Sequence, residues 1–214
     1  MDFTVASYAA WRADEASAKP DVSFIPPLER RRLTGVERAA LSVAWQVRPE
    51  GEVPIVFASR WGEIGVTVKL MTQFHADREM SPAGFSASVH NAAPGAFSLL
   101  THNHAPYTAI AARERSLEAG LLEALTQGAV VFVFAEEATP AFYAPAFGPL
   151  QRACALAVRL EPGSVATGCD HAAVRFRAEF RAVERAPVSF DAADAFFSGR
   201  ADALEAASFT LTRI

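Results

Sequence analysis

The charged triplet Arg113-Glu114-Arg115 is the segment of this 214-residue chain whose position could do chemistry. The apolar residues 107–112 before it predict a short strand, and the amphipathic residues after it predict a helix. A turn between a strand and a helix is where α/β proteins often present a nucleophile. Here the turn presents a glutamate between two arginines, which favour its charged form and make it a weak general base.

The histidines and cysteines do not form a convincing catalytic or metal-binding set. His102 and His104 are too close for the usual pair of helical ligands, and no third ligand has a suitable spacing, so we expect a capping or turn role. Cys169, Asp170 and His171 are adjacent, whereas the members of a triad come from different elements because neighbouring side chains point apart. We therefore predict no metal and no cofactor.

Other catalytic patterns are also missing from the sequence, which has neither a glycine-rich phosphate loop nor a GxSxG elbow. Glu118 and Glu123 lie on the helix expected after the triplet, and we expect them to face solvent. No pair of an acid and a base stands out.

The small residues of SASVHNAAPG (86–95) let a helix approach another backbone closely. Asn91 can bond a buried backbone group, and Gly95 can allow close packing. Pro94 interrupts the helix unless it lies in the first turn. Two interpretations stay open: a packed core helix, which composition favours, and a segment that lines an interface or an acyl channel.

The hydrophobic pattern predicts the elements that must position these residues. Strands are expected over 3–8, 53–59, 107–112, 129–135, 153–160, 173–183 and 209–212. Besides the helix after the triplet, helices are expected over 28–47, 63–76 and 192–207, the last with a break at Gly199. The helix over 63–76 should bury Ile64, Val68, Leu70, Met71 and Phe74, and the strand over 173–183 alternates like an exposed edge strand. Without a repeat or a linker, residues 1–214 should form one α/β domain with a mixed sheet.

Arg30, Arg31 and Arg32 lie in the first turn of the helix expected over 28–47, which is an unfavourable place for cations. They either form a solvated face, as charge runs usually do, or contact an acidic partner or another part of the fold.

Composition excludes several classes of protein. The net charge is −4 and the arginines do not gather into a stripe, so nothing suggests a nucleic-acid partner. The start of the chain does not resemble a signal peptide, and no apolar run is long enough to span a membrane. Two cysteines do not make a disulfide framework, so we expect a soluble cytoplasmic protein with reduced thiols.

A series of short motifs recurs in an order and spacing typical of one family. They are SP at 81–82, SVHNAAPG at 88–95, APYTAIA at 105–111, AGLLEA at 119–124, PLERRRL at 27–33, VFVFAEE at 131–137 and ACALA at 153–157. With these motifs, residues 24–160 resemble the N-terminal half of β-ketoacyl synthases, specifically the short ketosynthase-like proteins found with aryl polyene biosynthesis. The resemblance implies a thiolase-like half: a three-layer α/β/α domain with a five-stranded mixed sheet.

The resemblance also implies what the triplet has lost. Condensing enzymes place a nucleophilic cysteine at the start of the helix after this strand, where the helix dipole helps to form the thiolate. That position falls at Glu114 or within two residues of it, and neither cysteine is near it in sequence. The second half-domain, which supplies further catalytic side chains, has no counterpart in this shorter chain. A carboxylate cannot hold an acyl chain as a thioester, so we expect no activity from the chain alone.

The function implied is that of a chain length factor, a non-catalytic subunit that forms a heterodimer with a full-length β-ketoacyl synthase in aryl polyene or fatty-acid-like biosynthesis. The candidates for the dimer seam and acyl pocket are Ser88, His90, Asn91, Gly95, Tyr107, Thr108 and Glu114. One alternative is a scaffold that binds acyl carrier protein, an acidic partner, through Arg30, Arg31 and Arg32. Another is a small independent acyl thioesterase that uses Glu114 or a histidine.

Overall fold

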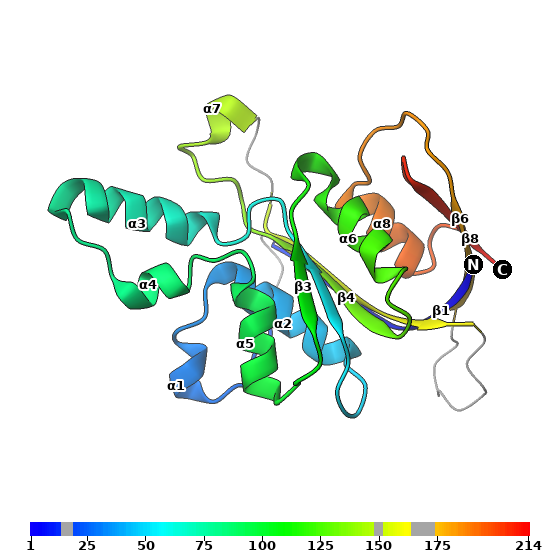
Figure 1. Ribbon diagram of the computed structural model, residues 1–214, viewed down its shortest axis with the longest axis horizontal. Coiled ribbons are helices and arrows are strands. Elements are labelled where there is room, and N and C mark those ends of the chain that lie inside the picture. The colour runs from blue at the N-terminus through cyan, green and yellow to red at the C-terminus, as the bar shows by residue number, and fades with distance from the viewer. Residues whose placement is uncertain (14–18, 148–151, 164–173) are drawn as a thin grey trace.

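A mixed eight-stranded sheet forms the centre of the computed structural model, which describes residues 1–13, 19–147, 152–163 and 174–214 (Figure 1). Its strands follow the order β3-β2-β4-β5-β1-β6-β8-β7. The strands are β1 (Asp2–Arg12), β2 (Ile55–Ala58), β3 (Tyr107–Ile110), β4 (Val130–Glu136), β5 (Cys154–Pro162), β6 (Val174–Phe180), β7 (Ala203–Glu205) and β8 (Phe209–Arg213). Strand β2 pairs in parallel with β3 and β4, and the other pairs are antiparallel.

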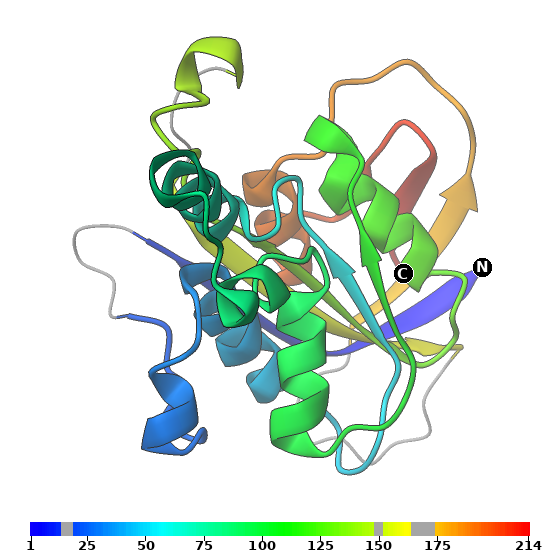
Figure 2. The ribbon, with the colours of Figure 1, turned by 60° about the vertical axis from the view of Figure 1, so that its left-hand side comes forward.

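Helices cover both faces of this sheet (Figures 1 and 2). The helices are α1 (Pro27–Arg30), α2 (Gly35–Val47), α3 (Ile64–Asp77), α4 (Pro82–Ser86), α5 (Ala92–Thr101), the 3₁₀ turn η1 (Arg113–Arg115), α6 (Ser116–Ala124), α7 (Ala144–Phe147) and α8 (Phe190–Phe197). Helices α2 and α5 contribute to one hydrophobic core, and α6 and α8 contribute to the core on the opposite face. The predicted three-layer α/β/α architecture is confirmed.

The expected number of strands is wrong. The five strands β3-β2-β4-β5-β1 account for the predicted sheet, but β6, β8 and β7 extend it beyond β1. The extension is possible because Asp2–Val5 of the long strand β1 also pair with residues 174–177. Strand β6 is therefore an inner strand rather than an exposed edge, and its Phe176 and Ala178 are buried.

The predicted helix over 28–47 is two helices. Thr34 begins α2 with a capping box: its Oγ1 accepts a hydrogen bond from the Glu37 amide at 3.0 Å, and the Glu37 carboxylate accepts one from the Thr34 amide at 2.7 Å. This cap separates α2 from the short α1. Arg30 consequently ends α1, and Arg31 and Arg32 lie in the connection.

Two other predicted helices need correction. Of the five apolar side chains expected inside α3, only Leu70 is buried, while Met71 is 60% exposed and Phe74 is 41% exposed. Helix α3 projects from the body of the molecule beside α4, so little lies against it (Figure 1). The helix expected over 192–207 ends at Phe197, because Gly199 takes a positive φ and the chain then forms β7.

Helix α6 lies unusually close to the sheet. Its Leu117, Leu121 and Ala124 are buried against the strands below. A Cβ atom added to Gly120 would be 2.4 Å from Cβ of Ala58 and 2.8 Å from the Phe132 ring. Such distances are far inside van der Waals contact, so only glycine permits this packing.

None of the helices in the described residues is long and apolar enough to cross a membrane.

A Cβ atom at residue 120 would overlap Ala58 and Phe132. Gly120→Ala should therefore destabilise the protein by about 1–3 kcal/mol, the usual range for overpacking a core, and lower Tm by several degrees. The matched control is Gly35→Ala, because a Cβ there meets nothing within 4 Å. The control should be neutral or stabilising by up to about 1 kcal/mol. Equal Tm values for the two variants in a thermal melt would contradict the packing described here.

Candidate functional site

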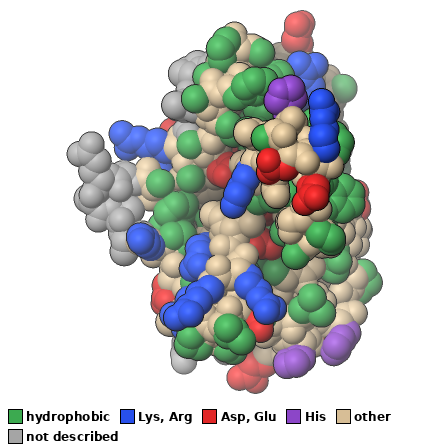
Figure 3. Space-filling view, turned by 90° about the vertical axis from the view of Figure 1, so that its left-hand side faces the viewer, with side chains coloured by type: hydrophobic (Ala, Val, Ile, Leu, Met, Phe, Trp, Pro, Cys, Tyr) green, Lys and Arg blue, Asp and Glu red, His purple; other side chains and the backbone are tan. Residues whose placement is uncertain are grey.

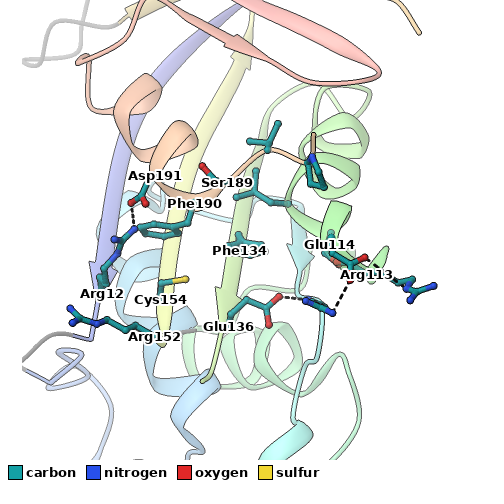
Figure 4. Close-up of a pocket in the computed structure, with 15 residues that line it drawn as sticks. Arg12, Arg113, Glu114, Phe134, Glu136, Arg152, Cys154, Ser189, Phe190 and Asp191 are labelled. Atoms are coloured by element: carbon teal, nitrogen blue, oxygen red, sulfur yellow. Dashed lines mark hydrogen bonds and ion pairs between the residues drawn. The ribbon is translucent and has the colours of Figure 1, made fainter. Parts of the chain in front are cut away.

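A pocket of about 440 Å³ lies where the carboxyl ends of β1, β2, β3 and β4 meet the start of the antiparallel β5 (Figure 4). This edge of an α/β sheet is where ligands commonly bind. The lining residues are Arg12, Arg60, Arg113, Glu114, Ser116, Leu117, Phe134, Glu136, Arg152, Cys154, Pro187, Val188, Ser189, Phe190 and Asp191. The pocket thus joins the predicted triplet to residues that are distant in sequence.

Glu114 lies at the mouth of this pocket and is held by arginines. Its Oε1 accepts a hydrogen bond from Nη2 of Arg60 at 2.8 Å, and its Oε2 is 3.8 Å from Nε of Arg113. A hydrogen bond from its own backbone amide, followed by the charges of Arg60 and Arg113, lowers the pKa of Glu114. The prediction that the charged form of Glu114 is favoured is confirmed, but the second arginine is Arg60 rather than Arg115, which pairs with Glu118.

The turn that carries Glu114 is strained but well anchored. Arg113 has a φ of 54°, in the left-handed region that non-glycine residues rarely adopt. The buried hydroxyl of Ser116 donates to the Arg113 carbonyl at 2.7 Å and accepts from the Ala112 amide at 2.9 Å. Ser116 therefore fixes the backbone at the beginning of α6.

Glu118 is buried, so the prediction that it faces solvent is wrong. Its Oε1 accepts hydrogen bonds from the amides of Ala207 at 3.0 Å and Ser208 at 3.3 Å, and its Oε2 pairs with Arg115 at 2.8 Å. These bonds fasten the connection between β7 and β8 to α6. Glu123, on the next turn, is half-buried and accepts a hydrogen bond from Gln127 at 2.7 Å.

A buried carboxyl group and a buried thiol lie inside the pocket. Glu136 accepts hydrogen bonds from the Arg60 amide and from the Ser59 hydroxyl, and burial raises the pKa of Glu136 to about 7. Burial, with a contribution from Glu136, raises the pKa of the Cys154 thiol to about 12. Cys154 and Glu114 line the same pocket although 40 positions separate them in sequence. A thiol with so high a pKa is not a thiolate at neutral pH and is a poor nucleophile.

Two further carboxyl groups, the buried Glu63 and the half-buried Glu137, position the segment between β2 and α3. Glu63 accepts a hydrogen bond from the Thr34 hydroxyl at 3.0 Å, and Glu137 accepts one from the Gly65 amide at 2.5 Å. Burial is the main reason that the pKa of Glu63 is raised to about 8, and the negative charges of Glu37 and Glu137 add to the effect. The sequence analysis assigned no role to Glu63 or to Glu137. The available signal for Glu137 was its position, next to Glu136, directly after an apolar strand.

The candidates for the dimer seam fall into two groups. The first three lie between α4 and α5: Ser88 donates to the Phe85 carbonyl at 2.8 Å, His90 is hydrogen-bonded through Nε2 to the Ser59 carbonyl at 2.9 Å, and Asn91 is exposed. Gly95, on α5, faces the second group on β3, because a Cβ added to it would be 3.4 Å from Oη of Tyr107. Tyr107 and Thr108 are exposed on that strand.

Asn103, rather than Asn91, satisfies a buried backbone group. Its Oδ1 accepts from the Val53 amide at 3.1 Å and its Nδ2 donates to the Val53 carbonyl at 2.8 Å. His102 ends α5 in the left-handed conformation, which confirms the capping or turn role of this segment. Pro94 lies in the first turn of α5, where proline is tolerated.

The three adjacent arginines do not act together. Arg30 donates to the carbonyl of Ile25 at 2.9 Å and to that of Ser23 at 3.3 Å, so it binds its own chain. Arg31 and Arg32 are exposed, and Arg32 is 3.6 Å from Glu29.

No group of three or more His, Cys, Asp or Glu side chains suited to a metal ion occurs in the described residues. Cys169, Asp170 and His171 lie outside the described residues.

Comparisons with known proteins agree on one fold. A family model described as β-ketoacyl synthase, N-terminal domain, matches residues 6–198. Among solved structures, a ketosynthase (ApeO) in complex with its chain length factor (ApeC) from Xenorhabdus doucetiae matches with a TM-score of 0.75 and 21% identity, over 100% of both chains. A search of curated proteins finds no match.

Two longer structures are similar over part of their length. The ishigamide ketosynthase/chain length factor matches with a TM-score of 0.55 and 16% identity, over 71% of this chain and 49% of that one. A β-ketoacyl synthase from Burkholderia phymatum STM815 matches with a TM-score of 0.59 and 12% identity, over 88% and 58%. The chain thus spans only about half of these two proteins, and at these identities the likeness establishes a thiolase-like fold.

The buried carboxyl groups predict a specific dependence of stability on pH. The pKa of Glu63 is raised on folding, so its contribution to stability is complete below the ordinary value of 4.5 and is lost as the pH rises towards 8. Glu63→Gln keeps an acceptor for Thr34 but cannot ionise. Its Tm relative to the wild type should therefore rise by several degrees between pH 5 and pH 8, since one pKa unit corresponds to about 1.4 kcal/mol.

Glu79→Gln is the control for this series, because Glu79 is exposed. Its Tm difference from the wild type should stay constant over the same range. A Glu63→Gln difference that does not change with pH would contradict the assignment of a buried, neutral carboxyl group.

Proposed function

Because the chain belongs to the family of β-ketoacyl synthase N-terminal domains, we propose that it is a non-catalytic subunit, similar to a chain length factor, that pairs with an active full-length β-ketoacyl synthase. The observation that carries the proposal is Glu114, an ionised carboxylate paired with Arg60 in the turn η1 directly before α6. The resemblance places the cysteine of condensing enzymes at this residue or within two residues of it. A carboxylate in this place forms no thioester. The Cys154 thiol, with a pKa of about 12, is no substitute.

The open edge of the sheet at β3 supports a partner. The carbonyls of Pro106 and Ile110 accept hydrogen bonds from β2, so the alternate residues Tyr107 and Ala109 direct their backbone groups away from the sheet. Within the described residues β3 is the last strand on this side. An unpaired edge of this kind is a ready template for a strand of another chain.

Apolar side chains beside this edge support the same conclusion. Leu99 lies one helical turn after Gly95, which faces Tyr107, so Leu99 and Tyr107 lie on the same side of the molecule. Leu99 is 79% exposed and Tyr107 is 39% exposed. Apolar side chains also lie on the face formed by α3 and α4, where Met71 and Phe85 are each 60% exposed (Figure 3). Exposed apolar surface next to an open strand favours a protein–protein interface.

Two of the similar structures are of a ketosynthase with a chain length factor, which supports this kind of pairing for the present chain. In this proposal the partner is a β-ketoacyl synthase of aryl polyene or related fatty-acid-like synthesis, the complex is a cytoplasmic heterodimer, and the dimer seam includes Gly95, Tyr107 and Thr108. Residues 1–214 act as one domain. The thioesterase alternative is disfavoured because an ionised, arginine-paired Glu114 is a weak base.

A scaffold function is the second candidate, and the exposure of Arg31 and Arg32 favours it. An acyl carrier protein is acidic, so exposed arginines would attract it electrostatically. The range of this attraction decreases as the salt concentration rises. The two functions are compatible, because these arginines belong to the connection after α1 and not to β3.

Ala109→Pro tests the pairing at β3. Proline removes the outward amide at position 109 without breaking a hydrogen bond to β2, so the fold should be retained while an added strand loses a bond and meets the ring. We expect binding to an immobilised full-length β-ketoacyl synthase from the same organism to weaken at least tenfold. The control Ala109→Ser keeps the amide and should bind within threefold of the wild type. A proline variant that is folded, by circular dichroism, and binds normally would exclude this edge.

Charge reversal tests the carrier contact separately. Arg31→Glu combined with Arg32→Glu should weaken binding of acyl carrier protein at least fivefold in low salt and flatten its salt dependence, since the attraction is electrostatic. Arg78→Glu combined with Arg175→Glu changes the net charge equally at two other exposed arginines and should have little effect. Carrier binding that is equal in both double variants would remove the scaffold function.

A further inference from the structure

Helices α3 and α4 form an arm, residues 64–89, that projects from the body of the molecule (Figure 1). Within the arm the two helices pack on each other, because a Cβ atom added to Gly84 of α4 would be 2.9 Å from Cδ2 of Leu70 on α3. Residues 71–79, from the middle of α3 to the turn after it, are exposed. The position of the arm therefore depends mainly on its neck, which we define as residues 59–63 and His90.

Hydrogen bonds join the two segments of the neck to each other and to the sheet. The Gly62 amide donates to Oγ of Ser59 at 2.8 Å, and that hydroxyl donates to Glu136 at 3.2 Å. The positive charge of Arg60 acts on Glu136. At the other end of the arm, Nε2 of His90 is 2.9 Å from the Ser59 carbonyl oxygen. Both ends of the arm thus meet at Ser59.

Two glycines lie where the chain enters the arm. Gly62 has a φ of 53°, in the left-handed region that favours glycine, and Gly65 lies in the first turn of α3. Trp61, the residue before Gly62, packs on the rings of Tyr143 and Phe147 outside the arm. A change in the direction of the arm would therefore occur between residues 62 and 65.

Glu63 lies between these glycines and is only 3% exposed. Its Oε1 accepts a hydrogen bond from the Thr34 hydroxyl at 3.0 Å, which connects the beginning of the arm to the cap of α2. Glu118 is as well buried but pairs with Arg115, whereas Glu63 makes no ion pair with a described residue. A buried carboxyl group with a hydroxyl as its partner is stable when neutral and costly when charged.

The charges that surround Glu63 act in the same direction as its burial. Burial raises the pKa of Glu63 to about 8, and the negative charges of Glu37 on α2 and Glu137 after β4 add to the effect. Arg38 acts on Glu37 rather than on Glu63. The stabilising contribution of the neutral Glu63 is therefore present at neutral pH and is lost as the pH rises through 8.

We infer that Glu63 is a proton-controlled latch: with its proton bound it attaches the arm to the cap of α2 through Thr34, and loss of that proton to solvent releases the arm about Gly62 and Gly65. Helix α3 has 14 residues, and an isolated helix of this length is marginal in water, so the released α3 unfolds locally. Release also redirects the exposed apolar side chains of α3 and α4. The latch belongs to this chain alone and does not rest on the proposed function.

Cleavage by a lysine-specific endoproteinase reports release of the arm. Lys69 is exposed on α3, and the other lysine, Lys19, precedes Pro20, where such enzymes cut poorly. Cleavage inside a helix requires local unfolding, so its rate follows the population of the open form. The rate at Lys69 in the wild type, divided by the rate in Glu63→Gln at the same pH, should rise at least tenfold from pH 6.5 to pH 8.5, because only the wild type gains a buried charge. The division removes the pH dependence of the enzyme itself.

Glu79→Gln is the matched control, since it removes a carboxylate from an exposed position of the arm and should follow the wild type at every pH. If circular dichroism shows that Glu63→Gln does not fold, the wild-type rate is divided instead by that of a lysine-containing peptide in the same tube. A ratio that stays constant between pH 6.5 and pH 8.5 by either measure overturns the inference.

A second position for the lysine distinguishes release of the arm from unfolding of the whole protein. Lys69→Arg combined with Gln46→Lys moves the cleavage site to an exposed position of α2, a helix that packs on the sheet. Cleavage there at pH 8.5 should be at least tenfold slower than cleavage at Lys69. Equal rates at the two positions would mean that Glu63 controls the whole fold, which contradicts a latch on the arm.

Discussion

Helix α6 lies against β2 and β4 only because residue 120 has no side chain, and much of the molecule depends on that contact. The depth of α6 places Ser116 under the turn before it, where the hydroxyl holds the backbone of Ala112 and Arg113. One turn into the helix, Glu118 reaches the amides between β7 and β8 and attaches the end of the chain. The close packing therefore determines both where Glu114 is presented and how the three added strands are held.

The carboxyl ends of β2, β3 and β4 bring together the side chains that form one wall of the pocket. Arg60 follows β2, Glu114 follows β3 and Glu136 ends β4, and backbone and side-chain bonds among them close one side of the pocket. Glu136 is buried and hydrogen-bonded to Ser59 and Arg60. Cys154 is buried, and the raised pKa of its thiol makes it a poor nucleophile. In the proposed function, the position near which condensing enzymes carry their nucleophile is occupied by the ion pair of Glu114 and Arg60 at the mouth of the pocket.

The sequence predicted the order of the central strands and helices correctly. It did not predict which of their side chains are capping, buried or exposed. The strands around 55, 108, 132 and 157 followed from apolar runs. The charged form of Glu114 was predicted from two neighbouring arginines, but only Arg113 contributes, together with Arg60 and the backbone amide of Glu114. The capping box at Thr34 and the buried position of Glu118 depend on partners distant in sequence or on backbone geometry, which periodicity does not report. Helix α3 has an apolar pattern typical of a core helix, yet Met71 and Phe74 are exposed. Such a pattern cannot distinguish a face buried in its own fold from a face that meets another chain.

The proposed function requires this chain to be one half of a pair. The most direct measurement is the native mass of the complex that forms when the chain is co-expressed with a full-length β-ketoacyl synthase from the same organism. The account predicts a stable one-to-one complex whose condensing activity requires the cysteine of the synthase and persists in Glu114→Ala. A chain that remains a monomer, or that pairs only with itself in the presence of the synthase, would contradict it.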